Sequence, residues 1–227
     1  VYTYDDAGHR LTMTTTEGVH TYVYDANYQL VGASYPDGSS ESFEYDPLGN
    51  RVRSTIDGVA TNYTRNELNQ YTAVGGKPYA YDANGNLTSN GTDTYEYDFE
   101  NRLVKAKTPS GSVTFTYDAF GRRLSRSTPS GTVNYVYDGD RVLAEKGDGG
   151  AVQAAYVYGP ETDEPLVLST GDDVYYYAQD GLGSVSGLSD GTGNPVESYS
   201  YAAFGTPTNL SGVGNPYLFT GREFDSE

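Results

Sequence analysis

The sequence has no cysteine, no tryptophan and only two histidines in 227 residues. Without cysteine the chain can form neither disulfides nor thiolate metal sites, so its stability must come from packed surface and hydrogen bonds. Apolar residues are also scarce, at 36% even when tyrosine is counted. No apolar run approaches the length of a membrane span, and the first residues show no signal-peptide pattern. The chain starts within a repeat, so we interpret it as a fragment of something longer.

Positive charge is limited as well. Fourteen Lys and Arg residues face 31 acids, which gives a formal net charge of -17. Recognition of nucleic acid depends on Lys and Arg neutralising phosphates, so this balance argues against a nucleic-acid partner. It fits a soluble surface, or attraction to a basic partner.

Tyrosine and glycine are abundant, with 24 and 28 copies. The tyrosines recur in units of aromatic, one spacer, then Tyr-Asp. We therefore expect tyrosine rings to supply much of the buried surface. The second aromatic of each unit falls at Tyr4, Tyr24, Tyr45, Tyr81, Tyr97, Tyr117, Tyr137, Tyr158, Tyr177 and Tyr201. The step is near twenty residues, and a degenerate unit over 63–71 fills the widest gap.

Each unit predicts a strand followed by a tight turn. Residues two apart share one face of a strand, so Phe115 and Tyr117 present paired rings on the same side. The next residue, Asp118, opens a four-residue turn in which its carboxylate accepts backbone N–H groups, and Gly121 closes the turn at positive φ. The repeat motif is predicted to comprise Tyr4, Asp5, Gly8, Tyr24, Asp25, Tyr45, Asp46, Gly49, Tyr81, Asp82, Gly85, Tyr97, Asp98, Tyr117, Asp118, Gly121, Tyr137 and Asp138.

A second set of turns lies between these units, at Asp-Gly and Pro-x-Gly steps such as Asp57-Gly58 and Pro109-Ser110-Gly111. Such steps between alternating strands indicate hairpins. We predict an all-β fold, a long antiparallel meander of hairpins that bends into a strongly curved sheet. Five leucines are expected to open the returning strands: Leu11, Leu87, Leu103, Leu124 and Leu143. The open edges of such a sheet could also pair with another copy.

The pattern Tyr-x-Tyr-Asp-x-x-Gly-x-Leu resembles the RHS or YD repeat of bacterial RHS toxins, Tc toxin C subunits, wall-associated proteins and teneurins. The resemblance covers nearly the whole chain, with a YD array over 1–174 and an RHS core-associated closing segment over 175–227. Key residues of the closing segment are Asp180, Gly183, Tyr201, Phe204, Gly205, Pro216, Phe219, Gly221 and Arg222. The family implies a spiral sheet that forms part of a hollow cocoon around a C-terminal toxin or effector. It also implies self-cleavage at aspartates further along, a motif that no residue here matches.

Three turns depart from the pattern. Tyr28 stands where a turn glycine is expected, Glu100 and Asn101 replace another such turn, and the segment Tyr158-Gly159-Pro160 lacks the aspartate. These departures affect the expected geometry of single turns rather than the array.

Chemical alternatives have weaker support. Acid pairs suitable for glycoside hydrolysis are available only in turn-like stretches, where solvated carboxylates are the usual case. His9 and His20 lie in no nucleophile or zinc pattern, and we expect both in exposed strand or turn positions. Calcium is conceivable near Asp148 or Asp190 but unassigned, and no cofactor, metal or catalytic residue is predicted. The acids considered were Asp172, Asp173, Glu161, Asp163 and Glu164. The arginines after the turns, Arg51, Arg102, Arg122, Arg123 and Arg141, are expected to pair with acids of the neighbouring hairpin.

The first functional hypothesis is therefore structural: a non-enzymatic shell segment that encloses a C-terminal toxin or effector, secreted or at the bacterial cell surface. Its partners would be that effector or another shell segment. The alternative is an extracellular YD-repeat module that binds carbohydrate or another cell surface through its aromatic rings.

Overall fold

The computed structural model describes residues 1–225, which form two compact units, Val1–Thr92 and Asp93 onward. Within these residues the elements are strands, apart from one 3-10 turn, η1 (Phe219–Gly221). The all-β prediction is confirmed. The expected change from YD array to closing segment at 174/175 concerns the type of repeat, which this division into units does not test, and it stays a prediction.

Unit 1 is a meander in which each strand pairs with the next along the chain. Strands β1 to β9 form one antiparallel sheet in sequence order, and β10 pairs with β11. The strands are β1 (Tyr2–Tyr4), β2 (Arg10–Thr14), β3 (Val19–Tyr24), β4 (Leu30–Ser34), β5 (Ser40–Tyr45), β6 (Arg51–Ile56), β7 (Val59–Arg65), β8 (Tyr71–Val74), β9 (Lys77–Pro78), β10 (Ala80–Tyr81) and β11 (Leu87–Ser89).

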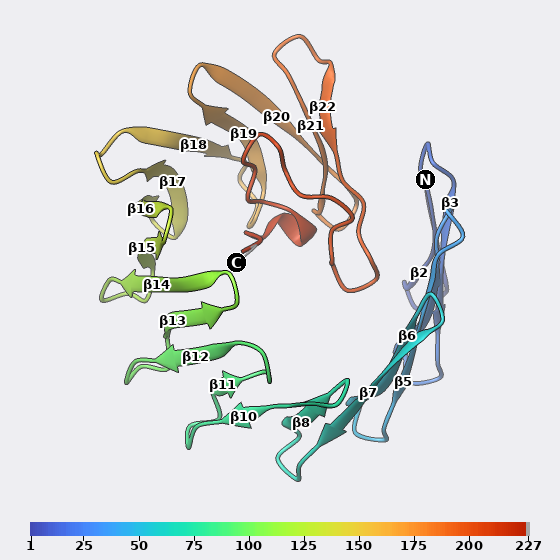
Figure 1. The fold of residues 1–227 in the computed structure, drawn as a ribbon. Coiled ribbons are helices and arrows are strands. Elements are labelled where there is room, and N and C mark those ends of the chain that lie inside the picture. The colour runs from blue at the N-terminus through green and yellow to red at the C-terminus, as the bar shows by residue number, and fades with distance from the viewer. Residues whose placement is uncertain (226–227) are drawn as a thin grey trace. The chain divides into compact units, whose positions relative to one another are not determined.

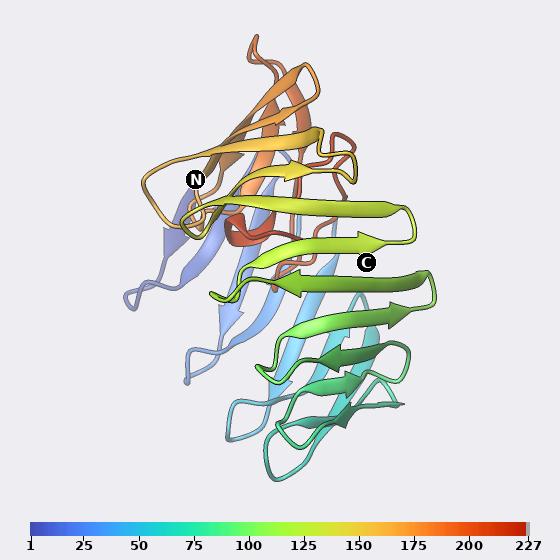
Figure 2. The same ribbon diagram turned by 90° about the vertical axis from the view of Figure 1, so that its left-hand side faces the viewer.

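Unit 2 continues the same pattern with longer strands. Strands β12 to β22 pair antiparallel in sequence order, and their sheet curves around the last part of the chain (Figure 1). Figure 2 shows the successive strands of this unit side by side. The strands are β12 (Thr94–Tyr97), β13 (Leu103–Thr108), β14 (Gly111–Tyr117), β15 (Arg123–Thr128), β16 (Gly131–Asp138), β17 (Arg141–Lys146), β18 (Val152–Tyr158), β19 (Pro165–Thr170), β20 (Asp173–Gln179), β21 (Val185–Ser189) and β22 (Pro195–Ser198).

The aspartate turns have the local geometry expected from the sequence. At the first of them, Oδ1 of Asp5 accepts the N–H of Ala7 at 3.0 Å and of His9 at 2.8 Å. The N–H of Gly8 donates to the Asp5 carbonyl at 3.1 Å, with φ of 89° at Gly8. One carboxylate thus satisfies two backbone donors that the turn leaves unpaired. The same two bonds to the carboxylate recur at Asp25, Asp46, Asp82, Asp98, Asp118, Asp180 and Asp190. Positive φ recurs at Gly49, Gly85, Gly121 and Gly183.

Two of the three departures from the motif keep this turn, whereas after Tyr158 a longer loop forms in which the N–H of Gly159 donates to the carbonyl of Glu164. Tyr28 and Asn101 occupy the glycine position with φ of 64° and 61°, and the closing backbone bond is still made. In the degenerate unit, Oδ1 of Asn66 accepts two backbone N–H groups in place of an aspartate. A non-glycine residue at positive φ carries strain of roughly 1 kcal/mol, which the surrounding hairpin tolerates. Asp138 differs: it ends β16 and pairs with Arg141 across a two-residue turn.

Each aspartate turn is followed by a β-bulge, which corrects the expected role of three leucines. Tyr117 pairs with Arg123 and Thr116 with Ser125, so Leu124 is left unpaired between them. Leu11 and Leu143 hold the equivalent bulged place, and all three are well exposed. Leu87 and Leu103 stand one position earlier, pair with Tyr81 and Tyr97, and are half-buried. The bulge therefore reverses which residue of the returning strand faces the rings.

Within residues 1–225, no helix has the length and apolar character needed to span a membrane.

Candidate functional site

The candidate site is the aromatic face of the unit 2 sheet, here called the tyrosine face. It carries Phe115, Tyr117, Tyr135, Tyr137, Tyr156, Tyr158, Tyr175 and Tyr177. In three of the four pairs the first aromatic is the buried one, with Phe115 at 7%, Tyr135 at 8% and Tyr156 at 2% exposure, whereas Tyr175 and Tyr177 are both half-buried. Tyr135, Tyr156 and Leu168 belong to one core cluster, against which Tyr137, Tyr158, Tyr175 and Tyr177 pack. Each aromatic side chain of this size buries a large apolar area.

The second tyrosine of each pair has a specific polar role. The hydroxyl of Tyr117 donates to the carbonyl of Leu103 at 2.7 Å, and that of Tyr137 to the carbonyl of Arg123 at 2.8 Å. The acceptor is the first residue of the preceding returning strand, directly before its bulge. The same bond joins Tyr24 to Arg10, Tyr45 to Leu30, Tyr158 to Val142 and Tyr201 to Val185. Each of these six tyrosines thus ties its hairpin to the one before it.

This tie was missed by the sequence analysis, which treated both tyrosines of a pair as ring surface. The signal was present, because donor and acceptor lie 14 to 16 residues apart in every case. Burial raises the pKa of Tyr117 and of Tyr137, which keeps both hydroxyls protonated as donors.

The arginines after the turns pair differently from the prediction. Arg122 donates to the carboxylate of its own turn residue, Asp118, at 2.7 Å, rather than to an acid of the neighbouring hairpin. It reaches that hairpin instead through the carbonyl of Gly139 and by lying 5.0 Å from the ring centre of Tyr137. Arg102 repeats this arrangement with Asp98. Arg141, in contrast, donates to the carbonyls at 159–161. The guanidinium of Arg51 lies 4.6 Å from the ring centre of Phe43.

Residues 199–225, here called the return loop, leave the sheet after β22 and fold back onto the tyrosine face (Figure 1). Tyr217 is its central contact. The hydroxyls of Tyr217 and Tyr158 are 2.7 Å apart, and the Tyr217 ring lies edge-on to those of Tyr156, Tyr158 and Tyr177. Burial raises the pKa of Tyr158 to about 12.

Asn215 organises the loop around Tyr217 and is 6% exposed. Its Oδ1 accepts the hydroxyl of Tyr177 at 2.8 Å and the backbone N–H of Tyr217 at 3.0 Å. Its Nδ2 donates to the Tyr217 carbonyl at 2.8 Å and to the Tyr199 hydroxyl at 3.3 Å. A buried amide with all four bonds made fixes one geometry of the loop, because any displacement leaves polar groups unpaired.

Several predicted closing residues meet at the base of the loop. The rings of Tyr201 and Phe219 are 5.5 Å apart, and a Cβ at Gly205 would lie 2.5 Å from the Phe219 ring. A Cβ at Gly221 would lie 2.0 Å from the carbonyl oxygen of Asp163. Both glycines are therefore required by close approach.

Of the remaining predicted closing residues, some contact the base of the return loop and others lie elsewhere. Arg222 Nε forms an ion pair with the Asp163 carboxylate at 2.9 Å, so an acid first weighed for catalysis holds the loop instead. Pro216 accepts the N–H of Phe224 at 2.7 Å. Asp180 and Gly183 form a separate aspartate turn, and Phe204 is 52% exposed.

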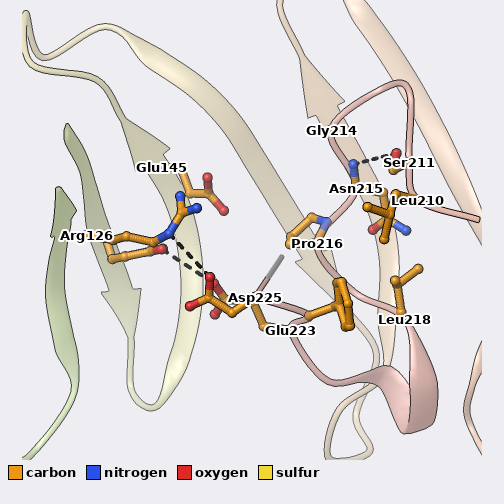
Figure 3. A pocket seen from close by; sticks show the side chains of 12 residues that line it. Arg126, Glu145, Leu210, Ser211, Gly214, Asn215, Pro216, Leu218, Glu223 and Asp225 are labelled. Carbon is orange, nitrogen blue, oxygen red and sulfur yellow. Dashed lines mark hydrogen bonds and ion pairs between the residues drawn. The ribbon is translucent and has the colours of Figure 1, made fainter. Parts of the chain in front are cut away.

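The last described residues reach two arginines of β15. Arg123 Nη1 lies 3.5 Å from carboxylate oxygens of Glu223 and Asp225, and Arg126 Nε lies 3.6 Å from Asp225. A cavity of about 330 Å³ adjoins these pairs, and Arg126 and Glu145 point toward it from the sheet (Figure 3). Burial raises the pKa of Glu145, whose Oε1 accepts the Tyr156 hydroxyl at 2.7 Å. Together these ion pairs hold Glu223 and Asp225 against the tyrosine face.

A family model, the teneurin YD-shell, matches residues 2–214. The chain belongs to the YD-shell family. It is 34% identical over 212 residues to the tRNA nuclease WapA of Bacillus subtilis strain 168, and equally to the tRNA3(Ser)-specific nuclease WapA of Bacillus spizizenii. Each match covers 88% of this YD-shell chain and 9% of the relative, so the chain spans about a tenth of these proteins.

The fold of this YD shell is also similar to a solved structure, the Tc holotoxin pore of Photorhabdus luminescens. The TM-score is 0.76 at 15% identity, over 99% of this chain and 14% of the other. At that identity the likeness supports the fold alone. The predicted resemblance to the RHS and YD-repeat family is confirmed.

Other acids of the YD shell serve its turns and loops. Glu164 accepts the N–H of Glu161 at 3.1 Å, and Asp190 accepts bonds from Thr192 and Asn194 that lower its pKa to about 2. Within residues 1–225, no three His, Asp or Glu side chains gather as a metal site. The histidine prediction was wrong for His20, which lies 3% exposed in β3. His9, half-buried in its turn, bonds Asp5 at 2.8 Å.

Proposed function

We propose that this chain is a wall segment of an RHS shell that encloses a C-terminal toxin or effector domain, in a secreted or cell-surface bacterial protein, and that it has no catalytic activity of its own. The observation that carries the proposal is the return loop. It brings the chain back onto the tyrosine face and holds residues 223–225 there, so a domain that follows would start from that face.

The chemistry of the loop fits a permanent attachment. Tyr217 and Asn215 contribute buried ring contacts and fully satisfied hydrogen bonds, whereas the arginine pairs to Glu223 and Asp225 are partly exposed. Exposed ion pairs contribute only about 0 to 1 kcal/mol each, so the buried tyrosine contacts supply most of the attachment and the ion pairs set where the end lies.

The supporting relatives point the same way. WapA proteins are named as tRNA nucleases, yet this chain matches only 9% of their length, and the YD-shell model matches residues 2–214 of this chain. The acidic charge of -17 does not suit direct contact with RNA. We propose that nuclease or other toxic activity in such proteins lies outside the part matched here.

Limited proteolysis of the full-length parent protein tests the enclosure. The C-terminal domain should resist a protease dose that degrades the same domain expressed alone. A double variant, Arg123→Glu with Arg126→Glu, should expose the segment after 225 to earlier cutting. Adding Glu223→Arg and Asp225→Arg should restore resistance, because the charges again attract. A C-terminal domain that is cut in the parent at the rate of the isolated domain would refute enclosure.

The alternative is an extracellular module that binds carbohydrate. It is favoured by turn-tip rings such as Phe99 and Phe120, which are 89% and 85% exposed. A glycan-array screen of residues 1–227 distinguishes the two proposals. Binding that is lost in Phe120→Ser would favour the module, and no binding to any sugar would leave the shell.

A further inference from the structure

One ionisable side chain in unit 1 is buried without a polar contact. His20 lies near the start of β3, 3% exposed, and neither ring nitrogen has a hydrogen-bond partner among the described residues. A neutral imidazole has one donor and one acceptor, and buried polar atoms are normally paired. His20 instead packs edge-on against Tyr35, with ring centres 5.6 Å apart.

The equivalent position in other hairpins shows that the fold does not need an imidazole here. His20 stands two residues before the buried aromatic Tyr22. In unit 2 the same place is held by Val113 and Ala154, which are 3% and 7% exposed. An apolar side chain therefore fills this position well, and it needs no hydrogen bonds.

The groups around His20 set the cost of placing a proton on it. Arg10 on β2 opposes a positive charge, whereas Glu17 in the β2–β3 turn and Asp37 in the β4–β5 turn favour it. Met13 of β2 is the strand partner of His20 and carries no charge, and the Tyr35 ring packs against the imidazole. Burial is the largest influence and lowers the pKa of His20.

We propose that His20 is an acid-sensitive lock on the sheet of unit 1: the neutral ring packs inside, and proton uptake requires it to reach water, which separates β3 from its neighbours. The neutral ring is the form that the fold accepts. In the unfolded chain an imidazole takes up a proton below pH of about 6.5, so acid stabilises the open form.

The sign and size of the effect follow from one proton. Above pH of about 6.5 both forms are neutral and opening does not depend on His20. Between that value and the lower pKa of the folded state, the equilibrium constant for opening should rise by up to about tenfold per pH unit. This consequence does not depend on whether the shell encloses a toxin.

Amide exchange of the whole 227-residue chain tests the lock. Peptides that cover β3 should show an opening constant that rises about fivefold from pH 6.5 to 5.5, after correction for the intrinsic exchange rate. His20→Val, which copies Val113, should remove this rise, and exchange of β3 at pH 7.5 should be no faster than in the wild type. The matched control His9→Phe removes the other histidine and should retain it. Parallel pH profiles for the wild type and His20→Val would overturn the proposal.

Proton NMR of the wild type provides a second measurement that does not depend on a variant folding. The chain has only two histidines, so their ring signals can be followed separately. The lock predicts that the His20 signal does not titrate in the folded state near pH 6.5. A His20 ring that gains its proton at pH 6.5 or above, with exchange of β3 unchanged, would also overturn it.

Discussion

Removal of one tyrosine hydroxyl, in Tyr137→Phe, should destabilise unit 2 although the ring stays in place. The hydroxyl donates to the Arg123 carbonyl at 2.8 Å, next to the bulge that Leu124 forms. A net hydrogen bond contributes about 1 kcal/mol, and an acceptor left unpaired in a partly buried site adds a desolvation cost of similar size. We therefore expect a loss of about 1 to 2 kcal/mol in the free energy of unfolding.

Urea unfolding followed by far-ultraviolet circular dichroism measures this loss. The matched control is Tyr4→Phe, because Tyr4 is the second tyrosine of its pair but is 55% exposed. Its variant should unfold within about 0.5 kcal/mol of the wild type. If Tyr137→Phe is no less stable than Tyr4→Phe, the hydroxyl tie does not stabilise the array and the tyrosine pairs act through their rings alone.

Three further results are expected. Asn215→Leu removes the acceptor of the Tyr177 hydroxyl and of the Tyr217 N–H, and should lower the free energy of unfolding in urea by about 3 kcal/mol. A loss below 1 kcal/mol would contradict its role as the centre of the loop. Gly121→Ala places a side chain at φ of 83° with no atom within 4 Å, so a loss of about 1 kcal/mol would report backbone strain, and Gly149→Ala, equally open but without positive φ, should cost nothing measurable. Burial raises the pKa of Tyr158 to about 12, so its contribution to the free energy of unfolding is complete below pH 10 and is lost as pH rises through 12. Absorbance at 295 nm should show the buried phenols ionising only when the protein unfolds. Ionisation of all phenols near pH 10 with the sheet intact would refute the burial.

The strands and turns were predictable because each is encoded within a few residues. Asp118 and Gly121 specify a turn by their own backbone chemistry, and the alternation of Phe115 and Tyr117 specifies a face. The bulge was not predictable in this way. Whether Leu124 faces the rings depends on one unpaired residue, and a shift of one position along a strand reverses the face of every side chain after it.

From the sequence, the return loop was recognised only as part of a closing segment, by its motif residues. Nothing within 199–225 indicates that Asn215 would meet Tyr177 or that Asp163 would meet Arg222, because these partners are 38 and 59 residues apart. His20 shows the same limit, since its burial follows from the position of β3 in the sheet and not from its neighbours in sequence. Contacts of this kind are made by the assembled sheet, and a local pattern does not contain them.

The backward tie that recurs from the second tyrosine of a pair to the preceding bulge has a consequence for how the number of repeats in such genes can change. A duplication or loss of one whole period carries donor and acceptor together and leaves every remaining tie intact. A duplication of half a period would separate a tyrosine from the carbonyl that its hydroxyl reaches 14 to 16 residues earlier. Recombination that conserves the twenty-residue frame is therefore tolerated, and arrays of different length can arise without redesign of any single hairpin.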